Sequence, residues 1–255
     1  MTAIFKRELL SYFRNPTGYV AIALFSFISG VFFIMQISQG SVEIASEVNS
    51  LRSFFIVLVP IVTMSLFSED RKRGTEVLYY TNPITMFDVV LGKFLAAMSL
   101  FFIMFINVFI HMIATKIFGG KIGVGTWGTV IVFFFLAALF VALGCLASAL
   151  TDSQIISAIV CFVFILIVQL ISTLSGLFNT AITTVLTKMN VGSEQANSIG
   201  TAIADCINWF DPFVKTKNFR YGSFGVAPLI FCISMAIFFL YLTFRILEKK
   251  RWSQS

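Results

Sequence analysis

Charged residues are scarce in this 255-residue sequence. Asp, Glu, Lys and Arg make up only 12% of it, whereas soluble domains carry about 25%. Hydrophobic residues make up 58%, and 31 residues are phenylalanine. A soluble domain of this length needs more polar surface than such a composition supplies. The scarcity of charge therefore excludes an ordinary soluble protein and indicates an integral membrane protein.

Several motifs are also missing, and their absence excludes whole classes of function. The sequence has no complete Walker A motif, no HExxH and no GxSxG, and in the glycine-rich segment 119–125 no Ser or Thr follows Lys121. The four cysteines lack a CxxC spacing, which indicates neither a metal site nor a disulfide framework. We therefore predict a protein that is not an enzyme and that holds no cofactor or metal itself.

The charges that are present sum to +6. They form short basic clusters beside apolar runs, an arrangement typical of contacts with phospholipid headgroups. Nucleic-acid binding would require basic and aromatic residues interleaved on one surface, and the sequence has no such pattern. We expect a lipid membrane, and no nucleic acid, as a partner.

Six apolar stretches approach the length of about 20 residues that a membrane span requires. They are 19–37, 51–67, 94–117, 127–150, 155–177 and 226–247. An amphipathic helix over 2–15, with Phe5, Leu9 and Tyr12 on its apolar face, precedes them. This pattern predicts an all-α polytopic membrane protein with six transmembrane helices in a single domain over 1–255.

Two of these stretches carry a further signal. Pro60 lies in the middle of the second and predicts a bend there, because proline removes a backbone hydrogen bond. The second half of the fourth contains small residues at spacings that allow helices to approach closely. We expect the fourth span at the centre of the bundle. These small residues are Ala138, Ala142, Gly144, Ala147 and Ser148.

Six spans place both chain ends on one side of the membrane. Most of the 18 Lys and Arg residues also lie on that side, including the clusters 71–73 and 249–251. The positive-inside rule then predicts that both termini and the segment 68–93 are cytoplasmic.

The segment 68–93 is the long polar interruption on this side, and it predicts two short helical pieces. Thr75 suits an N-cap, with Glu76 in the first turn, and Asn82-Pro83 would end that helix. Thr85 to Asp88 has the spacing of a capping box, which indicates the start of the next helix. We expect a short, capped helix beneath the membrane.

The third span contains two polar residues, Asn107 and His111, four positions apart on one helical face. Ionisable residues inside a membrane are candidates for a role in transport or proton relay. Asn and His also commonly form hydrogen bonds between helices, with no role in transport. The sequence leaves both interpretations open.

The segment 178–225 is the longest one outside the spans. It has an apolar stripe at helical spacing, which predicts a helix on or dipping into the outer membrane interface, or one packed against the bundle. The stripe consists of Ile199, Ile203, Cys206, Ile207 and Phe210. Before it, Thr151 to Gln154 has capping-box spacing and predicts the start of the fifth span.

Four segments in this order resemble the ABC-2 type transporter permeases. They are FKRELLSYFRNPTGYV, SEDRKRGTEVLYYTNPIT, SALTDSQIISAI and LTFRILEKKRW. The likeness is to the short six-span branch, which includes the permease of the gliding-motility ABC system. It covers nearly the whole chain and is weakest in 178–225.

The resemblance implies a permease subunit that forms half of an export pathway in a bacterial plasma membrane. A separate ABC ATP-binding subunit would hold ATP and Mg²⁺, a second permease chain would complete a homodimer, and the transported substrate is left unknown. The family's coupling helix corresponds to about 69–83, its elbow helix to 2–15 and its external helices to 178–225. The implied ATPase-coupling residues are Glu69, Arg73, Gly74, Thr75, Glu76, Leu78 and Pro83.

Two other classes of function stay open at this point. One is a structural membrane anchor of an envelope or motility machine, without its own substrate pathway. The other is an intramembrane enzyme that uses His111 and Asn107.

Overall fold

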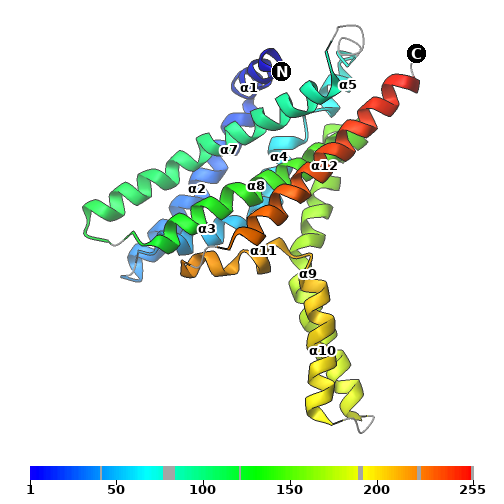
Figure 1. Ribbon diagram of the computed structural model, residues 1–255. Helices are drawn as coiled ribbons and strands as arrows, with labels where there is room; N and C mark the ends of the chain where they lie inside the picture. Colours follow the sequence, from blue (N-terminus) through cyan, green and yellow to red (C-terminus); the bar gives the residue numbers. More distant parts are fainter. Residues whose placement is uncertain (41, 77–83, 121, 189–191, 223–224, 254–255) are drawn as a thin grey trace.

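The computed structural model describes residues 1–40, 42–76, 84–120, 122–188, 192–222 and 225–253, and within these residues the protein is helical and has no strand (Figure 1). This agrees with the all-α fold class that the sequence predicts. The helices are α1 (Thr2–Arg14), α2 (Pro16–Ser38), α3 (Ile44–Ser53), α4 (Phe55–Thr63), α5 (Ser68–Lys72), α7 (Met86–Ile117), α8 (Val124–Leu150), α9 (Gln154–Lys188), α10 (Ser193–Asn208), α11 (Pro212–Lys215), the 3-10 helix η1 (Lys217–Tyr221) and α12 (Val226–Ser253).

Five helices in the described part of the chain are long and apolar enough to cross a membrane. They are α2, α7, α8, α9 and α12. A sixth span is possible if α3 and the helix over 55–72 are taken together, since this pair is bent by 61°. Five or six such helices fit the polytopic membrane protein that the hydropathy of the sequence predicts.

The bend in this pair is not at Pro60, where the sequence places it. The helices break at Phe54, and Pro60 lies inside α4. Hydrogen bonding continues past the proline, because the Met64 amide donates to the Pro60 carbonyl at 2.9 Å. Most α4 side chains, Pro60 included, are buried. We attribute the unbroken helix to this packing, which holds α4 in place despite the missing amide proton.

Helix α8 is the most buried of the five long apolar helices, as expected for the fourth span. Gly144 faces Thr63 of α4 so closely that a Cβ atom at position 144 would lie 2.3 Å from the Thr63 hydroxyl oxygen. Phe133 and Phe140 of the same helix are fully buried. Small residues therefore bring α8 and α4 together, and large aromatic residues fill the space elsewhere along α8.

Both chain ends lie at one end of the bundle, which we call the terminal end, together with α1 and α5 (Figure 1). The connection between α2 and α3 lies at the opposite end, which we call the distal end. There α9 runs on past the bundle, and α10 returns beside it as a helical hairpin.

The face of α10 that packs on α9 differs from the one that the sequence predicts. Ala196 and Ala204 are buried, and a Cβ at Gly200 would lie 2.3 Å from the Asn179 side chain of α9. Ile199 and Ile203 of the predicted apolar stripe are exposed instead. Ile199 and Ile203 therefore do not form the packed face, where small residues let the two helices approach more closely than isoleucine would, whereas Ile207 of the same stripe is half-buried. A location at the membrane interface stays a prediction.

Candidate functional site

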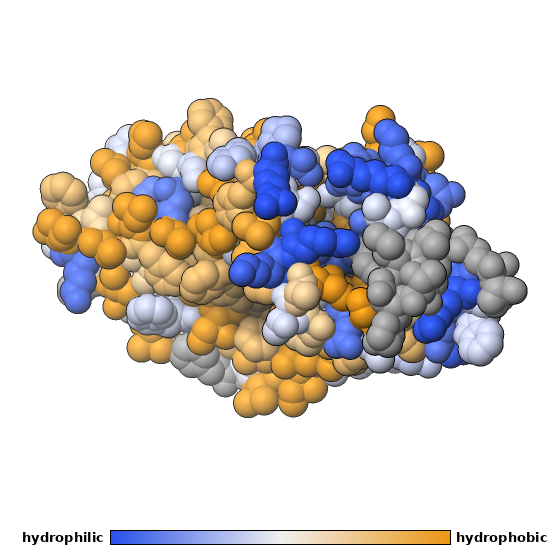
Figure 2. Space-filling view, turned by 90° about the horizontal axis from the view of Figure 1, so that it is seen from above, coloured by the Kyte–Doolittle hydropathy of each residue, from blue (hydrophilic) through white to orange (hydrophobic). Residues whose placement is uncertain are grey.

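At the terminal end, segments that are far apart in the sequence meet around α5. Helix α1, the start of α7, the 151–153 turn between α8 and α9, and α12 all contribute side chains or carbonyl groups. Seen from this end, hydrophilic side chains gather in groups beside a hydrophobic flank (Figure 2). This junction contains the described part of the predicted coupling segment.

Lys93 of α7 is the buried cation of the junction, with only 1% of its side chain exposed. Its Nζ atom lies 2.6 Å from Asp70 Oδ2 and 3.1 Å from Glu8 Oε1, and it also donates to the Leu66 carbonyl. A lysine ammonium has three protons to donate, and each has an acceptor here. Burial of the charge is thereby compensated, and α7 is tied to α1 and α5 at once.

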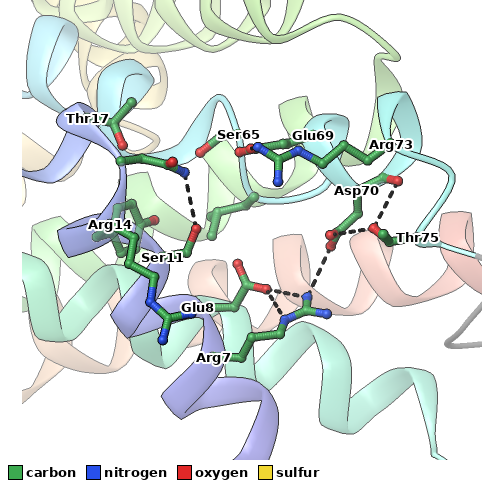
Figure 3. A pocket seen from close by; sticks show the side chains of 13 residues that line it. Arg7, Glu8, Ser11, Arg14, Thr17, Ser65, Glu69, Asp70, Arg73 and Thr75 are labelled. Carbon is green, nitrogen blue, oxygen red and sulfur yellow. Dashed lines mark hydrogen bonds and ion pairs between the residues drawn. The ribbon is translucent and has the colours of Figure 1, made fainter.

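The Asp70 carboxylate makes two further contacts (Figure 3). Its Oδ2 atom lies 3.4 Å from Arg7 Nη2 of α1, and its Oδ1 atom accepts a 2.9 Å hydrogen bond from the Thr75 hydroxyl. Arg7 also contacts Glu8 at 2.5 Å. The two carboxylates therefore lie between two cations, Lys93 and Arg7.

Arg71, the next residue along α5, contacts the other side of the junction. Its guanidinium donates to the carbonyls of Ala149 and Thr151 at 3.0 and 2.9 Å and to Asp152 Oδ1 at 2.5 Å. Its Nε atom donates to Glu76 at 3.2 Å. The last carbonyl groups of a helix have no partner within that helix, so Arg71 satisfies the end of α8. The hydrogen bond from Arg71 also lowers the pKa of Asp152.

Two more contacts fix the ends of these helices. The Ser148 hydroxyl oxygen accepts from the Phe67 and Ser68 amides at 3.0 and 3.3 Å, which satisfies amide groups at the start of α5. Lys250 of α12 donates to the Ala149 carbonyl at 3.2 Å. The elements of the junction are therefore joined by hydrogen bonds as well as by apolar packing.

The residues that the resemblance assigns to ATPase coupling are only partly described. Glu69 pairs with Arg73 at 2.5 Å, and the Arg73 side chain is 64% exposed. Gly74 has a φ of +70°, a left-handed conformation that favours glycine. Leu78 and Pro83 lie outside the described residues, as does most of the helix expected from Thr75 to Asn82.

The local predictions for helix starts have mixed outcomes. Thr85 caps α7 as expected, since its Oγ1 atom accepts from the Asp88 amide at 3.2 Å. The Thr75 hydroxyl donates to Asp70, and its expected role as an N-cap stays a prediction, because the amides it would cap lie outside the described residues. Thr151 also donates backwards, to the Ala147 carbonyl, so the expected capping box at the start of α9 is wrong.

The contacts that hold the junction together were not predicted. Lys93 counts in the sequence as one more basic residue near the membrane surface, yet it is buried. Glu8, Asp70 and Arg71 appear only as members of polar stretches. The sequence contained one signal for Glu8. It lies one helical turn from both Ile4 and Tyr12, the buried residues of α1, and therefore on the face of α1 that packs against the bundle.

A second polar cluster lies inside the bundle towards the distal end. His111 Nδ1 of α7 lies 2.8 Å from Glu47 Oε1 of α3, and the Ser29 hydroxyl of α2 donates to the same oxygen at 2.5 Å. The Phe33 ring stacks on the imidazole at 4.2 Å. Asn107 is half-buried one turn away, and no hydrogen bond within the described residues joins it to the cluster.

The cluster forms hydrogen bonds between helices, and a role of His111 and Asn107 in transport or proton relay stays a prediction. A nucleophilic serine would donate to the imidazole, whereas the Ser29 hydroxyl donates to Glu47 and lies 3.4 Å from the histidine nitrogen that contacts the carboxylate. Glu47 is fully buried, and its Oε2 atom has no hydrogen-bond partner within the described residues. The cluster joins α2, α3 and α7 but leaves one carboxylate oxygen unsatisfied.

These features define a multi-pass, all-α membrane protein with a polar junction at one end. Over residues 3–250 the sequence matches the ABC-2 family transporter proteins, and the chain belongs to that family. It is thus a permease component of an ABC-2 transporter, and membership implies association with an ABC ATP-binding subunit. A search of curated proteins found no match.

Proposed function

We propose that the protein is the membrane subunit of an ATP-driven exporter and that it receives the motion of its ATP-binding subunit at the terminal end. The ATP-binding subunit holds ATP and Mg²⁺, and this chain supplies half of the translocation pathway, with a second copy supplying the other half. In this proposal the terminal end faces the cytoplasm of a bacterial cell.

The observation that supports this proposal is the way α5 is attached. Asp70 connects it to α1 and α7, while Arg71 connects it to the end of α8, the 151–153 turn and Glu76. A force on α5 or on the segment that follows it would therefore reach several spanning helices together. A flexible linker at this position would dissipate such a force.

The proposed binding surface is the exposed side of the segment after α5. Arg73 is largely exposed there and has its acidic partner Glu69 one turn before it. Leu78, which lies outside the described residues, is the apolar residue that we propose to be buried in the partner. The substrate stays unassigned, because a bundle with lipid-facing helices suits many classes of exported molecule.

The test uses Leu78→Asp, with Lys188→Asp at the distal end as the control. We expect the tagged parent protein and the control to co-purify the ATP-binding subunit from native membranes, and Leu78→Asp to lose it while still inserting into the membrane. An unpaired carboxylate in a buried contact costs several kcal/mol, by the usual penalty for a charged interface anchor. Normal co-purification by Leu78→Asp would overturn the coupling assignment.

The orientation has a separate test. Single cysteines at positions 72 and 217, both exposed in the structure, are introduced into a variant that lacks the four native cysteines. A membrane-impermeant thiol reagent added to intact cells should label position 217 and spare position 72. Labelling of position 72 would place the terminal end outside the cell.

A further inference from the structure

A polar cavity of about 280 Å³ lies at the terminal end, between α1 and the junction of α4 with α5. Arg14 lines it at the end of α1, Thr17 at the start of α2, and Ser65 just before α5 (Figure 3). Arg73 and Glu69 line it from the segment around α5. The cavity therefore opens at the joint where the amphipathic helix turns into the first long apolar helix.

Most charges around this cavity already pair with one another. Arg7 contacts Glu8 and Asp70, and Arg73 contacts Glu69. Arg14 forms no hydrogen bond or ion pair within the described residues, and neither do the side chains of Thr17 and Ser65. One guanidinium and two hydroxyl groups are thus left to donate hydrogen bonds to a ligand.

These donors suit a phosphate group. Guanidinium groups bind phosphate through charge-assisted hydrogen bonds, and hydroxyl groups add neutral ones. The place of the cavity favours a phospholipid as the source. An amphipathic helix such as α1 lies at the level of the lipid headgroups, and α2 enters the apolar layer directly after it.

The acidic residues of the cavity restrict the kind of headgroup. Glu8, Glu69 and Asp70 line the same space as the three arginines, so the lining has no large positive excess. A multiply charged headgroup would be repelled by the carboxylates, whereas a headgroup with one phosphate and one ammonium has groups that match both signs. A primary ammonium can also donate hydrogen bonds to the carboxylates.

We propose that this cavity binds the phosphate of a membrane phospholipid with a zwitterionic headgroup, of the phosphatidylethanolamine type. Arg14, Thr17 and Ser65 hold the phosphate, and the carboxylates at the other side of the cavity accept from the ammonium. The bound lipid bridges α1 and the α5 junction, so the lipid composition of the membrane sets how firmly α1 is held.

The experiment measures thermal unfolding of the purified full-length protein in detergent, and lipid retained in native mass spectra. Short-chain phosphatidylethanolamine, phosphatidylcholine, phosphatidylglycerol and inorganic phosphate are each added to the parent protein. We expect phosphatidylethanolamine to raise the melting temperature most and to be retained. Equal stabilisation by inorganic phosphate would show that the cavity binds free phosphate and not a lipid. Tighter binding of phosphatidylglycerol would contradict the preference for a zwitterionic headgroup.

The variants separate this cavity from general lipid binding. Arg14→Gln should weaken the affinity for phosphatidylethanolamine roughly tenfold or more, since a hydrogen bond to a charged group is removed. Lys6→Gln loses the same charge from the same helix but lies outside the cavity lining, and it should bind like the parent protein. Ser65→Ala gives a second, milder reduction if Arg14→Gln does not fold. Parent-like binding by both cavity variants would overturn the proposal.

Discussion

Helix α7 carries an ionisable residue in a polar cluster towards each end, Lys93 and His111, and the two clusters differ in how fully their hydrogen bonds are satisfied. Lys93 at the terminal end has an acceptor for each of its three protons. His111, about 27 Å further along at 1.5 Å per residue, contacts Glu47, whose second oxygen has no partner within the described residues. In the cluster around Lys93 every ammonium proton has an acceptor. In the cluster around His111 one carboxylate oxygen of Glu47 has no partner within the described residues.

The difference shows which cluster tolerates change. When one member of a fully paired buried charge cluster is removed, several contacts are lost at once. The remaining charges stay buried without their partner, which destabilises the folded protein. A carboxylate with an unsatisfied oxygen already bears part of its desolvation cost in the folded protein. We therefore expect substitutions at the terminal end to cost more stability than comparable ones around His111.

The largest effect is expected for Lys93→Met. Methionine fills much of the same volume but leaves Asp70 and Glu8 without their buried cation, at a cost of about 3 kcal/mol or more in free energy of unfolding. Thermal unfolding of the purified protein measures it. The control is Lys116→Met, an exposed lysine near the distal end of α7. If the two substitutions lower the melting temperature equally, the buried contacts of Lys93 do not contribute the expected stability.

Arg71→Ala should have the next largest effect, about 2 kcal/mol. The substitution removes hydrogen bonds to the Ala149 and Thr151 carbonyls and to two carboxylates. Lys72→Ala, its exposed neighbour, is the matched control and should change the melting temperature little. If Arg71→Ala unfolds at the parent temperature, the end of α8 does not depend on α5.

Glu47→Gln tests the other half of the comparison. The amide keeps an oxygen that accepts from Ser29 and removes a buried charge with an unsatisfied oxygen, so we expect a change within about 1 kcal/mol. Asp70→Asn is the same kind of substitution at the terminal end and should cost more, because Lys93 keeps its charge. A greater loss of stability from Glu47→Gln than from Asp70→Asn would reverse the ranking of the two clusters.

The smallest effect is expected at Asp152, where solvent screens the ion pair because 80% of the side chain is exposed. The hydrogen bond from Arg71 lowers the pKa of Asp152 below the ordinary value of 3.8. A carboxyl whose pKa is lowered on folding stabilises the folded protein at pH values above its ordinary pKa. This stabilisation is lost as the pH falls through the lowered pKa. Asp152→Asn should therefore cost a few tenths of a kcal/mol at neutral pH.

The measurement for this prediction compares the melting temperatures of Asp152→Asn and the parent protein at pH 7 and over a series of falling acidic pH values. We expect the two proteins to differ slightly at neutral pH and to converge in acid, because the parent carboxyl is then protonated. A difference that persists unchanged in acid would show that the contact does not depend on charge.

Features that depend on neighbouring residues could be predicted from the sequence. The long apolar runs correspond to α2, α7, α8, α9 and α12, because the length of a hydrophobic run is a local property. The Thr85 cap was correct because an N-cap bond joins residues only three positions apart. The central place of α8 followed from its small residues, which the composition of that run already shows.

The tertiary structure alone decided which charges meet. Arg71 and Asp152 are 81 positions apart, and Arg7 and Asp70 are 63 apart, so no local pattern links them. Glu47 and His111 are 64 positions apart, and only the packing of α3 against α7 brings them into contact. The bend at Phe54 and the small-residue face of α10 also depend on packing against other helices. Helices form from local hydrogen bonds and hydrophobic length, whereas their buried ion pairs form only once the bundle has brought distant side chains together.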